Sequence, residues 1–259
     1  MNWLIQKIWT WPDGFIWRLT RRVSVQSRQK RFALFLRELH PGPETRILDV
    51  GVSGRQHYER AQNFLEEFYP QPECITAVGV DDLRAFNVRY SKVNVVQANG
   101  LCLPFRDKSF EIVFSNAVVE HVGGRAEQQA FVSECVRVGK AVFITTPSRS
   151  FPIESHTMIP LVHWLPDAFR NAVYRALGRE NEGTPGYLTL LSPRALKALF
   201  PRECRVRIIR QRVVGLASVL IAVVRHDQFQ RQLPVKTRLS KRLAKERMRA
   251  AGFARPRLD

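Results

Sequence analysis

The stretch that decides the fold is residues 46–55, which read Arg46-Ile47-Leu48-Asp49-Val50-Gly51-Val52-Ser53-Gly54-Arg55. In its first half, Ile47–Val50 form a short apolar run that includes one acid, which predicts a short strand buried in a sheet. Its second half is a turn of small residues, in which Gly51 and Gly54 permit positive φ and close approach of the backbone to a ligand. A nicotinamide-type fingerprint would need glycine at positions 53 and 56, where Ser53 and Gln56 stand, so that kind of cofactor turn is excluded.

Strand and helix patterns alternate through the rest of the central region. Four more apolar runs predict strands at Ile75–Val80, Val93–Gln97, Phe110–Phe114 and Ala141–Thr145. Helical stripes lie between them, at Ala61, Phe64, Leu65 and Phe68 and at Phe131, Cys135 and Val138. Arg205–Val214 and Ser218–Val224 predict a closing hairpin. We therefore expect an α/β, Rossmann-like fold, with a mostly parallel seven-stranded sheet, an antiparallel C-terminal hairpin and helices on both faces.

Composition and charge divide the chain of 259 residues into three parts. Residues 1–45 predict an amphipathic helical extension, residues 46–225 the α/β domain with a cap insertion at 147–186, and residues 226–259 a basic tail. The net charge is +18, from 41 Lys and Arg against 23 Asp and Glu. The two ends hold 8 basic against 3 acidic and 10 against 3 residues, which is two thirds of the excess. The charge favours an anionic membrane or nucleic acid as a partner. Because most of the excess lies at the two ends, it indicates where the protein docks more than what it acts on.

The four cysteines indicate the cellular setting. Cys74, Cys102, Cys135 and Cys204 are scattered, without the spacing of a zinc site or of a disulfide framework. We expect no metal and a reducing, cytoplasmic location, with attachment to a membrane periphery as the alternative. The longest apolar stretch, Val213–Val224, is too short to span a bilayer, and no secretory signal is visible.

Polar residues follow the expected strands at the sheet edge where ligands of such folds bind. Asp49 can organise the first loop and receive an ammonium. Asp81 follows the second strand, where an acceptor-only side chain can take both hydrogen bonds of a ribose diol. Asn99-Gly100-Leu101 follows the third, where an amide can recognise an adenine edge, with a plain Asn-Gly turn as the alternative. Together these loops predict a ligand that joins an adenosine to an amino-acid-like head group. S-adenosylmethionine is such a ligand.

Four motifs resemble the class I S-adenosylmethionine-dependent methyltransferases, especially the broad type-11 group. They are Ile47–Gly51, Val78–Asp81, Leu103–Phe110 and Val119–Val122, within a resemblance that runs from about Arg46 to Val224. The resemblance implies that the cofactor is held by Asp49, Gly51, Ser53 and Gly54 at its methionine part, by Asp81 with Asp82 at the ribose, by Asn99, Gly100 and Leu101 at the adenine, and by Asn116 after the fourth strand. The sequence departs from the family at Ser53 and Arg55, where glycines are usual, and at Asn99, where an Asp is usual.

Methyl transfer from a sulfonium is an in-line displacement, so that positioning supplies most of the rate. An acceptor oxygen or nitrogen can also need a base near the carboxyl ends of the fourth and fifth strands. The candidates there are His121, Glu154 and His156. The alternative is structural, with His121 capping a loop and the other two bonding to the backbone of an ordered surface segment.

Three functional classes remain open. The first is a methyltransferase acting on a small-molecule or lipid-like acceptor. The second is an RNA methyltransferase, which the charge favours but which lacks an Asn/Asp-Pro-Pro-Tyr type motif at residues 115–118. The third is a binding protein that kept the fold and lost turnover. Trp3, Trp9, Trp11 and Trp17, mixed with basic residues, predict either a helix at a lipid interface or a lid over the cofactor site.

Overall fold

The computed structural model describes residues 15–54, 63–154, 156–157 and 159–225, with side chains described from Val25 onward. The expectations for Trp3, Trp9, Trp11, Arg55, Ala61 and the basic tail lie outside the described residues, as does the side chain of Trp17.

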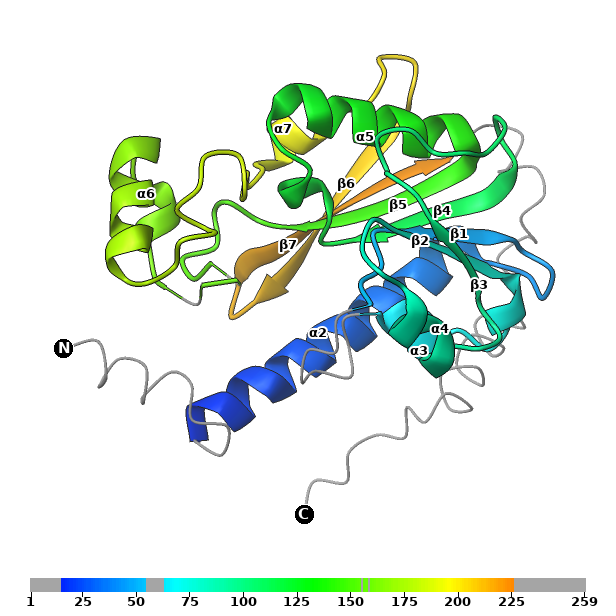
Figure 1. Ribbon diagram of the computed structural model, residues 1–259, viewed down its shortest axis with the longest axis horizontal. Coiled ribbons are helices and arrows are strands. Elements are labelled where there is room, and N and C mark those ends of the chain that lie inside the picture. The colour runs from blue at the N-terminus through cyan, green and yellow to red at the C-terminus, as the bar shows by residue number, and fades with distance from the viewer. Residues whose placement is uncertain (1–14, 55–62, 155, 158, 226–259) are drawn as a thin grey trace.

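A single sheet organises the described part of the chain (Figure 1). Its strands are β1 (Ile47–Val50), β2 (Ile75–Gly79), β3 (Asn94–Gln97), β4 (Phe110–Asn116), β5 (Gly139–Pro147), β6 (Val206–Val213) and β7 (Leu216–Arg225). The strand order is β3-β2-β1-β4-β5-β7-β6. Strands β1 to β5 are parallel, whereas β7 is antiparallel to both β5 and β6. The predicted fold class, including the closing hairpin, is confirmed.

Helices cover both faces of this sheet (Figure 1). The α-helices are α2 (Phe15–Leu39), α3 (Phe64–Phe68), α4 (Arg84–Arg89), α5 (Arg125–Val138), α6 (Asp167–Ala176) and α7 (Pro193–Lys197). Three short 3-10 helices are η1 (Pro72–Cys74), η2 (Val119–His121) and η3 (Val162–Trp164). One buried cluster joins α2, α3 and α4 to the sheet, and a second joins α5 and α7 to its other face.

The long helix α2 packs into the domain core along its described C-terminal half. Its predicted stripe, Phe32, Phe35, Leu36 and Leu39, is buried. The ring of Phe35 lies 5.3 Å from that of Phe114 in β4 and 5.5 Å from that of Phe143 in β5, in edge-to-face contacts. The helix ends at Leu39, as the following His-Pro-Gly-Pro run predicts. Apolar burial on this scale ties α2 to the sheet.

The strand order places the ligand site. Strand order reverses between β1 and β4, and ligands of open parallel sheets bind beyond the carboxyl ends of the strands at such a point; this region is called the crevice below. The segment after β5, which includes η3 and α6, extends beyond the same edge (Figure 1). Its ends are joined by a bridge between Ser148 and Leu191.

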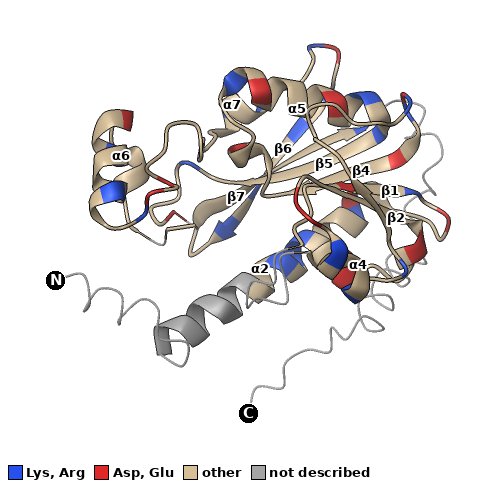
Figure 2. Ribbon diagram, in the orientation of Figure 1, with Lys and Arg blue, Asp and Glu red and all other residues tan. Residues whose placement is uncertain are grey.

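Charged residues of both signs are interspersed over the described part of the domain (Figure 2). This agrees with the nearly balanced count of 23 basic and 17 acidic residues in positions 46–225. Within the described ranges, no helix combines the length and the hydropathy that crossing a bilayer requires.

Candidate functional site

Two glycines shape the loop after β1. Gly51 has a φ of +99°, and a Cβ at this residue would lie 2.3 Å from Cγ2 of Val118. A Cβ at Gly54 would lie 2.1 Å from the carbonyl oxygen of Asp82. Both contacts are closer than real Cβ atoms allow, so glycine is required at both positions. The glycine displaced to position 54 therefore allows the loop that follows β2 to pack against the loop that follows β1.

Two buried carboxyl groups lie side by side on this part of the crevice. Asp49, in β1, is 5% exposed, and Glu66, in α3, is 6% exposed. Burial, and then the neighbouring Glu66, raises the pKa of Asp49, and burial raises the pKa of Glu66 to about 7. Both carboxyl oxygens of Glu66 lack a hydrogen-bond partner among the described residues. Such a pair is completed by a bound cation that donates hydrogen bonds, and the ammonium of an amino acid is one.

Asp81 and Asp82, expected at the ribose, have different surroundings. Asp82 is exposed and forms a bidentate ion pair with Arg84, with Nε and Nη2 of Arg84 donating to Oδ2 over 2.8 and 2.6 Å. The carboxylate of Asp82 is therefore engaged by Arg84. Asp81, half-buried, stands two residues after the end of β2.

The Asn99-Gly100-Leu101 loop forms an Asn-Gly turn, which was the structural alternative to an adenine-binding loop. Oδ1 of Asn99 accepts a hydrogen bond from the amide of Leu101 over 2.9 Å, and its carbonyl accepts one from Cys102. The side-chain NH2 of Asn99 makes no hydrogen bond within the described residues and can donate to a base edge. A Cβ at Gly100 would lie 2.7 Å from the ring of Phe131, so this loop rests directly on α5.

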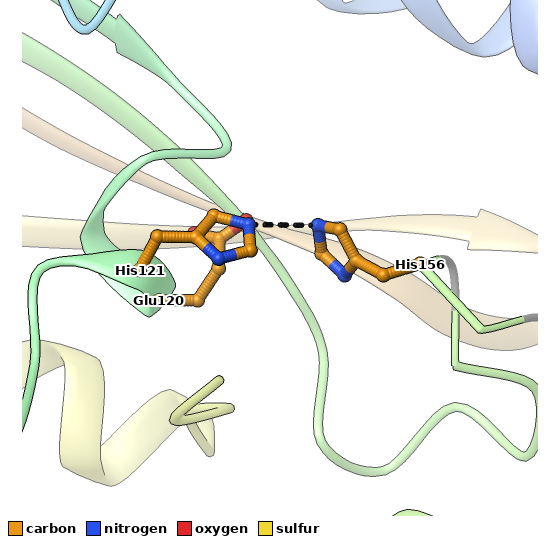
Figure 3. A group of neighbouring side chains, drawn as sticks. All are labelled: Glu120, His121 and His156. Atoms are coloured by element: carbon orange, nitrogen blue, oxygen red, sulfur yellow. Dashed lines mark hydrogen bonds between the residues drawn. The ribbon is translucent and has the colours of Figure 1, made fainter. Parts of the chain in front are cut away.

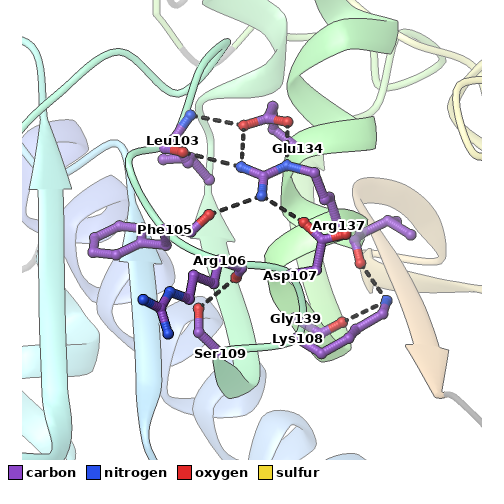
Figure 4. Close-up of polar contacts among 10 residues, drawn as sticks. Leu103, Phe105, Arg106, Asp107, Lys108, Ser109, Glu134, Arg137 and Gly139 are labelled. Carbon is purple, nitrogen blue, oxygen red and sulfur yellow. Dashed lines mark hydrogen bonds and ion pairs between the residues drawn. The ribbon is translucent and has the colours of Figure 1, made fainter.

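The most specific sequence motif, Leu103–Phe110, serves as a brace for that loop (Figure 4). The guanidinium of Arg137, in α5, donates to the carbonyls of Leu103 and Phe105 over 3.0 and 2.8 Å, and to Asp107. Both its Nε and Nη2 also donate to Glu134, which in turn accepts the amide of Leu103 over 2.7 Å. One arginine thus fixes the chain immediately after the expected adenine loop.

Asn116, at the end of β4, meets the N-terminal helix. Its Oδ1 accepts a hydrogen bond from Nη1 of Arg31 over 2.6 Å and another from the hydroxyl of Thr145 over 2.8 Å. Arg31 is 8% exposed, its guanidinium lies 5.6 Å from the centre of the Phe64 ring, and its Nε has no partner in the described ranges. Burial, and then the charge of Arg28, lowers the pKa of Arg31 to about 10. Helix α2 therefore places the buried guanidinium of Arg31 at the carboxyl end of β4.

The three candidate bases, His121, Glu154 and His156, come together. The Nε2 atoms of the two histidines are 2.9 Å apart, and their rings are perpendicular (Figure 3). Nδ1 of His156 lies 2.5 Å from Oε1 of Glu154. Nδ1 of His121 lies 3.2 Å from the carbonyl oxygen of Tyr187. Side chains 35 residues apart in sequence thus share one cluster beyond the ends of β4 and β5.

The pKa values of the three residues in this cluster shift in different directions. Burial raises the pKa of Glu154, but hydrogen bonds from His156 and from the amides of His156 and Thr157 outweigh it, and the pKa falls to about 2. Burial also lowers the pKa of His156, yet the bond to Glu154 and its charge raise it overall. Desolvation, and then His156, lowers the pKa of His121 to about 4, although part of this residue remains exposed. Glu154 is thus an ionised partner that stabilises a positive charge on His156.

A cavity of about 350 Å³ lies within the segment after β5, since all of its lining residues fall between Arg149 and Leu190. The amide of Thr189, one of its lining residues, donates to the carbonyl of Glu120 over 2.8 Å. Two buried atoms near the cavity, Nδ1 of His163 and the hydroxyl of Tyr174, have no hydrogen-bond partner within the described ranges. The cavity is lined by Arg149, His163, Asp167, Arg170, Asn171, Tyr174, Pro185, Gly186, Leu188, Thr189 and Leu190. Its size and its polar walls suit a small molecule.

Three buried charged residues of the site were not among the predicted site residues: Arg31, Glu66 and Glu120. Arg31 stands four residues before Phe35 on the apolar stripe of α2, and this placement was a usable signal of a buried charge. Glu120 directly precedes His121 in a motif already singled out. Glu66 has no comparable signal, because only the packing of α3 brings it to Asp49.

The comparisons with known proteins agree with this architecture. Residues 48–142 match the methyltransferase-domain family. Over 177 residues, 62% of the chain, it is 26% identical to a glycine/sarcosine/dimethylglycine N-methyltransferase of Actinopolyspora halophila, of which the match covers 30%. Over 80 residues, 29% of the chain, it is 36% identical to a probable S-adenosylmethionine-dependent methyltransferase of Mycobacterium tuberculosis, of which the match covers 28%. The chain thus spans about 30% of the length of the curated relatives it matches.

Solved structures share the fold. The PH0226 protein of Pyrococcus horikoshii superposes with a TM-score of 0.52 at 13% identity, over 79% of this chain and 90% of that one. The N-methyltransferase NodS of Bradyrhizobium japonicum, in complex with S-adenosyl-L-homocysteine, gives 0.50 at 11% identity, over 85% and 91%. At these identities the likeness shows the fold alone. Residues 48–142 thus match a methyltransferase domain, and the sheet that they belong to has the mostly parallel order with an antiparallel C-terminal pair that the sequence predicts.

Proposed function

We propose that the protein transfers a methyl group from S-adenosylmethionine to a small, polar acceptor. The observation that carries this proposal is the division of the crevice into two unlike halves. The half beside β1 holds the glycine-shaped loop and the buried pair Asp49 and Glu66, whereas the half beside β4 and β5 holds the His121–His156 cluster. A donor with an ammonium and an acceptor with an acidic proton are the two ligands that such halves suit.

On the cofactor side, the chain's own groups fit the parts of S-adenosylmethionine. Asp49 and Glu66 would receive the ammonium, Asp81 the ribose diol, and the 99–101 loop the adenine. Ser53, whose carbonyl accepts a hydrogen bond from Asn63 over 3.1 Å, would contribute the backbone of its loop together with Gly51 and Gly54. When bound, the cofactor supplies a sulfonium methyl carbon, which forms a bond to the acceptor's heteroatom as the carbon–sulfur bond breaks and its electron pair stays on sulfur.

On the acceptor side, the protein would orient the attacking atom and take up the proton that it loses. The proton passes to Nε2 of the His121–His156 pair, and the ionised Glu154, 2.5 Å from Nδ1 of His156, stabilises the resulting charge. Such proton transfer contributes roughly 10²–10⁴-fold to rate, beside the larger effect of orientation.

The cavity within the segment after β5 favours a small acceptor over a lipid or an RNA strand. About 350 Å³ is near the lower end of the range for small-molecule sites, and several of its walls are polar. One curated relative is named for glycine, sarcosine and dimethylglycine as substrates, so small amino-acid-like amines are the first acceptors to examine. Membrane or nucleic-acid contact would then belong to the basic ends of the chain.

The test is production of S-adenosylhomocysteine from S-adenosylmethionine with a panel of small amines, phenols and carboxylates. We expect turnover with at least one small polar acceptor, a large loss in Glu154→Ala and His156→Ala, and unchanged calorimetric affinity of both variants for the cofactor. Cofactor binding without turnover on any acceptor, RNA included, would favour the binding-protein alternative. Absence of cofactor binding at millimolar concentration would refute both enzyme classes.

A further inference from the structure

The imidazoles of His121 and His156 meet with their other nitrogens already committed. Nδ1 of His121 faces the carbonyl of Tyr187, which only accepts hydrogen bonds, so this nitrogen carries a proton. Nδ1 of His156 faces the carboxylate of Glu154 and likewise donates. In the neutral rings each Nε2 atom then carries a lone pair, and the two Nε2 atoms face each other over 2.9 Å (Figure 3). Two lone pairs at this distance repel unless a proton, as on a charged His156, or a metal ion lies between them.

A third potential ligand lies beside these nitrogens. Glu120 is fully buried, and one of its oxygens accepts a hydrogen bond from the hydroxyl of Thr146 over 2.9 Å. Its Oε1 has no hydrogen-bond partner among the described residues, which is costly for a buried carboxyl group. One carboxylate oxygen of Glu120 and one nitrogen of each histidine all lie within 4.8 Å of one another. The cluster therefore contains two facing lone pairs and an unsatisfied buried oxygen.

We propose that Glu120, His121 and His156 bind a divalent transition-metal ion through one carboxylate oxygen and the two Nε2 atoms. Two imidazoles and a carboxylate form a donor set that suits Zn²⁺, Mn²⁺, Fe²⁺ or Co²⁺. Nitrogens 2.9 Å apart subtend about 90° at an ion with bonds of about 2.0–2.1 Å. Closing Glu120 onto the same ion takes shifts on the order of 1 Å.

The groups behind the ligands are those that metal sites use. Ligating histidines usually donate their other ring N–H to a carboxylate or a backbone carbonyl, which fixes the ring and its tautomer. Here Glu154 and the carbonyl of Tyr187 occupy those two positions, and the amides of His156 and Thr157 hold Glu154 in place over 2.7 and 2.6 Å. Three protein ligands leave coordination positions for an acceptor.

The ion would specify how the acceptor half of the crevice works, and this role rests on the proposed function. With the ion bound, the two Nε2 lone pairs are occupied, so the proton uptake given above would belong to the metal-free pair only. The metal-bound cluster would instead orient and polarise an oxygen of the acceptor. The acceptor's proton would then leave to solvent.

The experiment is a Co²⁺ titration of the untagged full chain after chelator treatment, followed by visible absorption. We expect one Co²⁺ per chain with d–d bands, and loss of these bands when Zn²⁺ is added. His156→Ala and Glu120→Gln should weaken Co²⁺ affinity at least tenfold. His163→Ala, which removes a histidine of the same segment outside the cluster, should leave it unchanged.

Thermal unfolding of each variant provides the control for folding, and His121→Ala replaces any variant that does not fold. Equal Co²⁺ affinity in the wild type and the cluster variants would overturn the proposal. So would no Co²⁺ binding at millimolar concentration by a protein that still binds S-adenosylmethionine, because the two rings then share only a proton. Methyl transfer at full rate by the metal-free protein would overturn the ion's role and leave the proposed function standing.

Discussion

At the scale of single residues, the turn after β1 depends on the absence of a side chain at Gly54. An alanine Cβ there would lie 2.1 Å from the backbone oxygen of Asp82, so one of the two loops has to move. We expect Gly54→Ala to lower the free energy of unfolding by about 1–3 kcal/mol, the usual range for overpacking, and to weaken S-adenosylmethionine binding.

Calorimetry with the cofactor and denaturant unfolding check this expectation. Gly42→Ala is the matched control, because a Cβ at Gly42 would make only an ordinary contact of 3.6 Å with Thr45. If both variants bind the cofactor like the wild type, the 54 turn is not part of its site.

Glu66 makes the stability of the ligand-free protein depend on pH. Burial raises its pKa to about 7 in the folded state, above the ordinary 4.5 of the unfolded chain. A raised carboxyl pKa stabilises the fold below the unfolded value, and that stabilisation is lost as pH rises through the folded value. Between pH 4.5 and 7 we expect this group to cost up to about 3 kcal/mol of unfolding free energy.

Unfolding by urea at several pH values measures the effect. Glu66→Gln should reduce this slope and leave the part that comes from Asp49, whose pKa burial also raises. Saturating cofactor should reduce the slope in the wild type, because an ammonium beside the pair favours its ionised form. An identical pH dependence in the wild type and the variant would place the titration elsewhere.

At the scale of secondary-structure elements, Arg137 joins α5 to the loop that follows the expected adenine contact. Its guanidinium makes hydrogen bonds to Leu103, Phe105, Asp107 and Glu134 (Figure 4). We expect Arg137→Met to lower the unfolding free energy by about 1–3 kcal/mol, because it leaves backbone carbonyls without a hydrogen-bond donor. It should also raise the KM for S-adenosylmethionine.

Arg106→Met is the control for that substitution, since the guanidinium of Arg106 makes no hydrogen bond within the described part of the chain. Chemical denaturation and steady-state kinetics distinguish the two variants. Equal behaviour of both would mean that the loop is held by its backbone alone.

How much the sequence predicted also differs between elements. Strands were found because a buried parallel strand is a short apolar run, and β1 matches its prediction residue for residue. The hairpin followed from the position of Gly215, whose φ is +79°. The contact of Arg31 with Asn116 joins residues 85 positions apart, and no local pattern specifies such a pair. The His121–His156 contact escaped for the same reason, although both residues had been selected individually.

At the scale of the whole molecule, most of the excess charge lies outside the 46–225 domain. The tail contains Lys241, Arg242, Lys245 and Arg247, and each basic residue near an anionic membrane contributes about 1 kcal/mol to attraction. We expect the full chain to sediment with vesicles of anionic phospholipid at low salt and to release at high salt. Changing these four residues to Gln should reduce retention at least tenfold.

The matched control changes four exposed basic residues of the domain, Lys92, Arg179, Arg202 and Arg210, to Gln. Retention should then fall much less. If the two quadruple variants behave alike, the domain surface makes the contact, and if RNA displaces the vesicles from the wild type, nucleic acid competes for the same charges.

Glu38, near the end of α2, accepts ion-pair hydrogen bonds from Arg207 in β6 and Arg225 in β7, over 2.9 and 3.0 Å. The second of these contacts joins residues 187 positions apart. Because β7 also lies between β5 and β6, the sheet cannot be completed until the last described strand has been synthesised. A growing chain therefore leaves the edge of β5 unpaired while residues 148–225 are synthesised, a period in which such an edge is prone to aggregation. The order of synthesis makes β7 the step that ends this exposure.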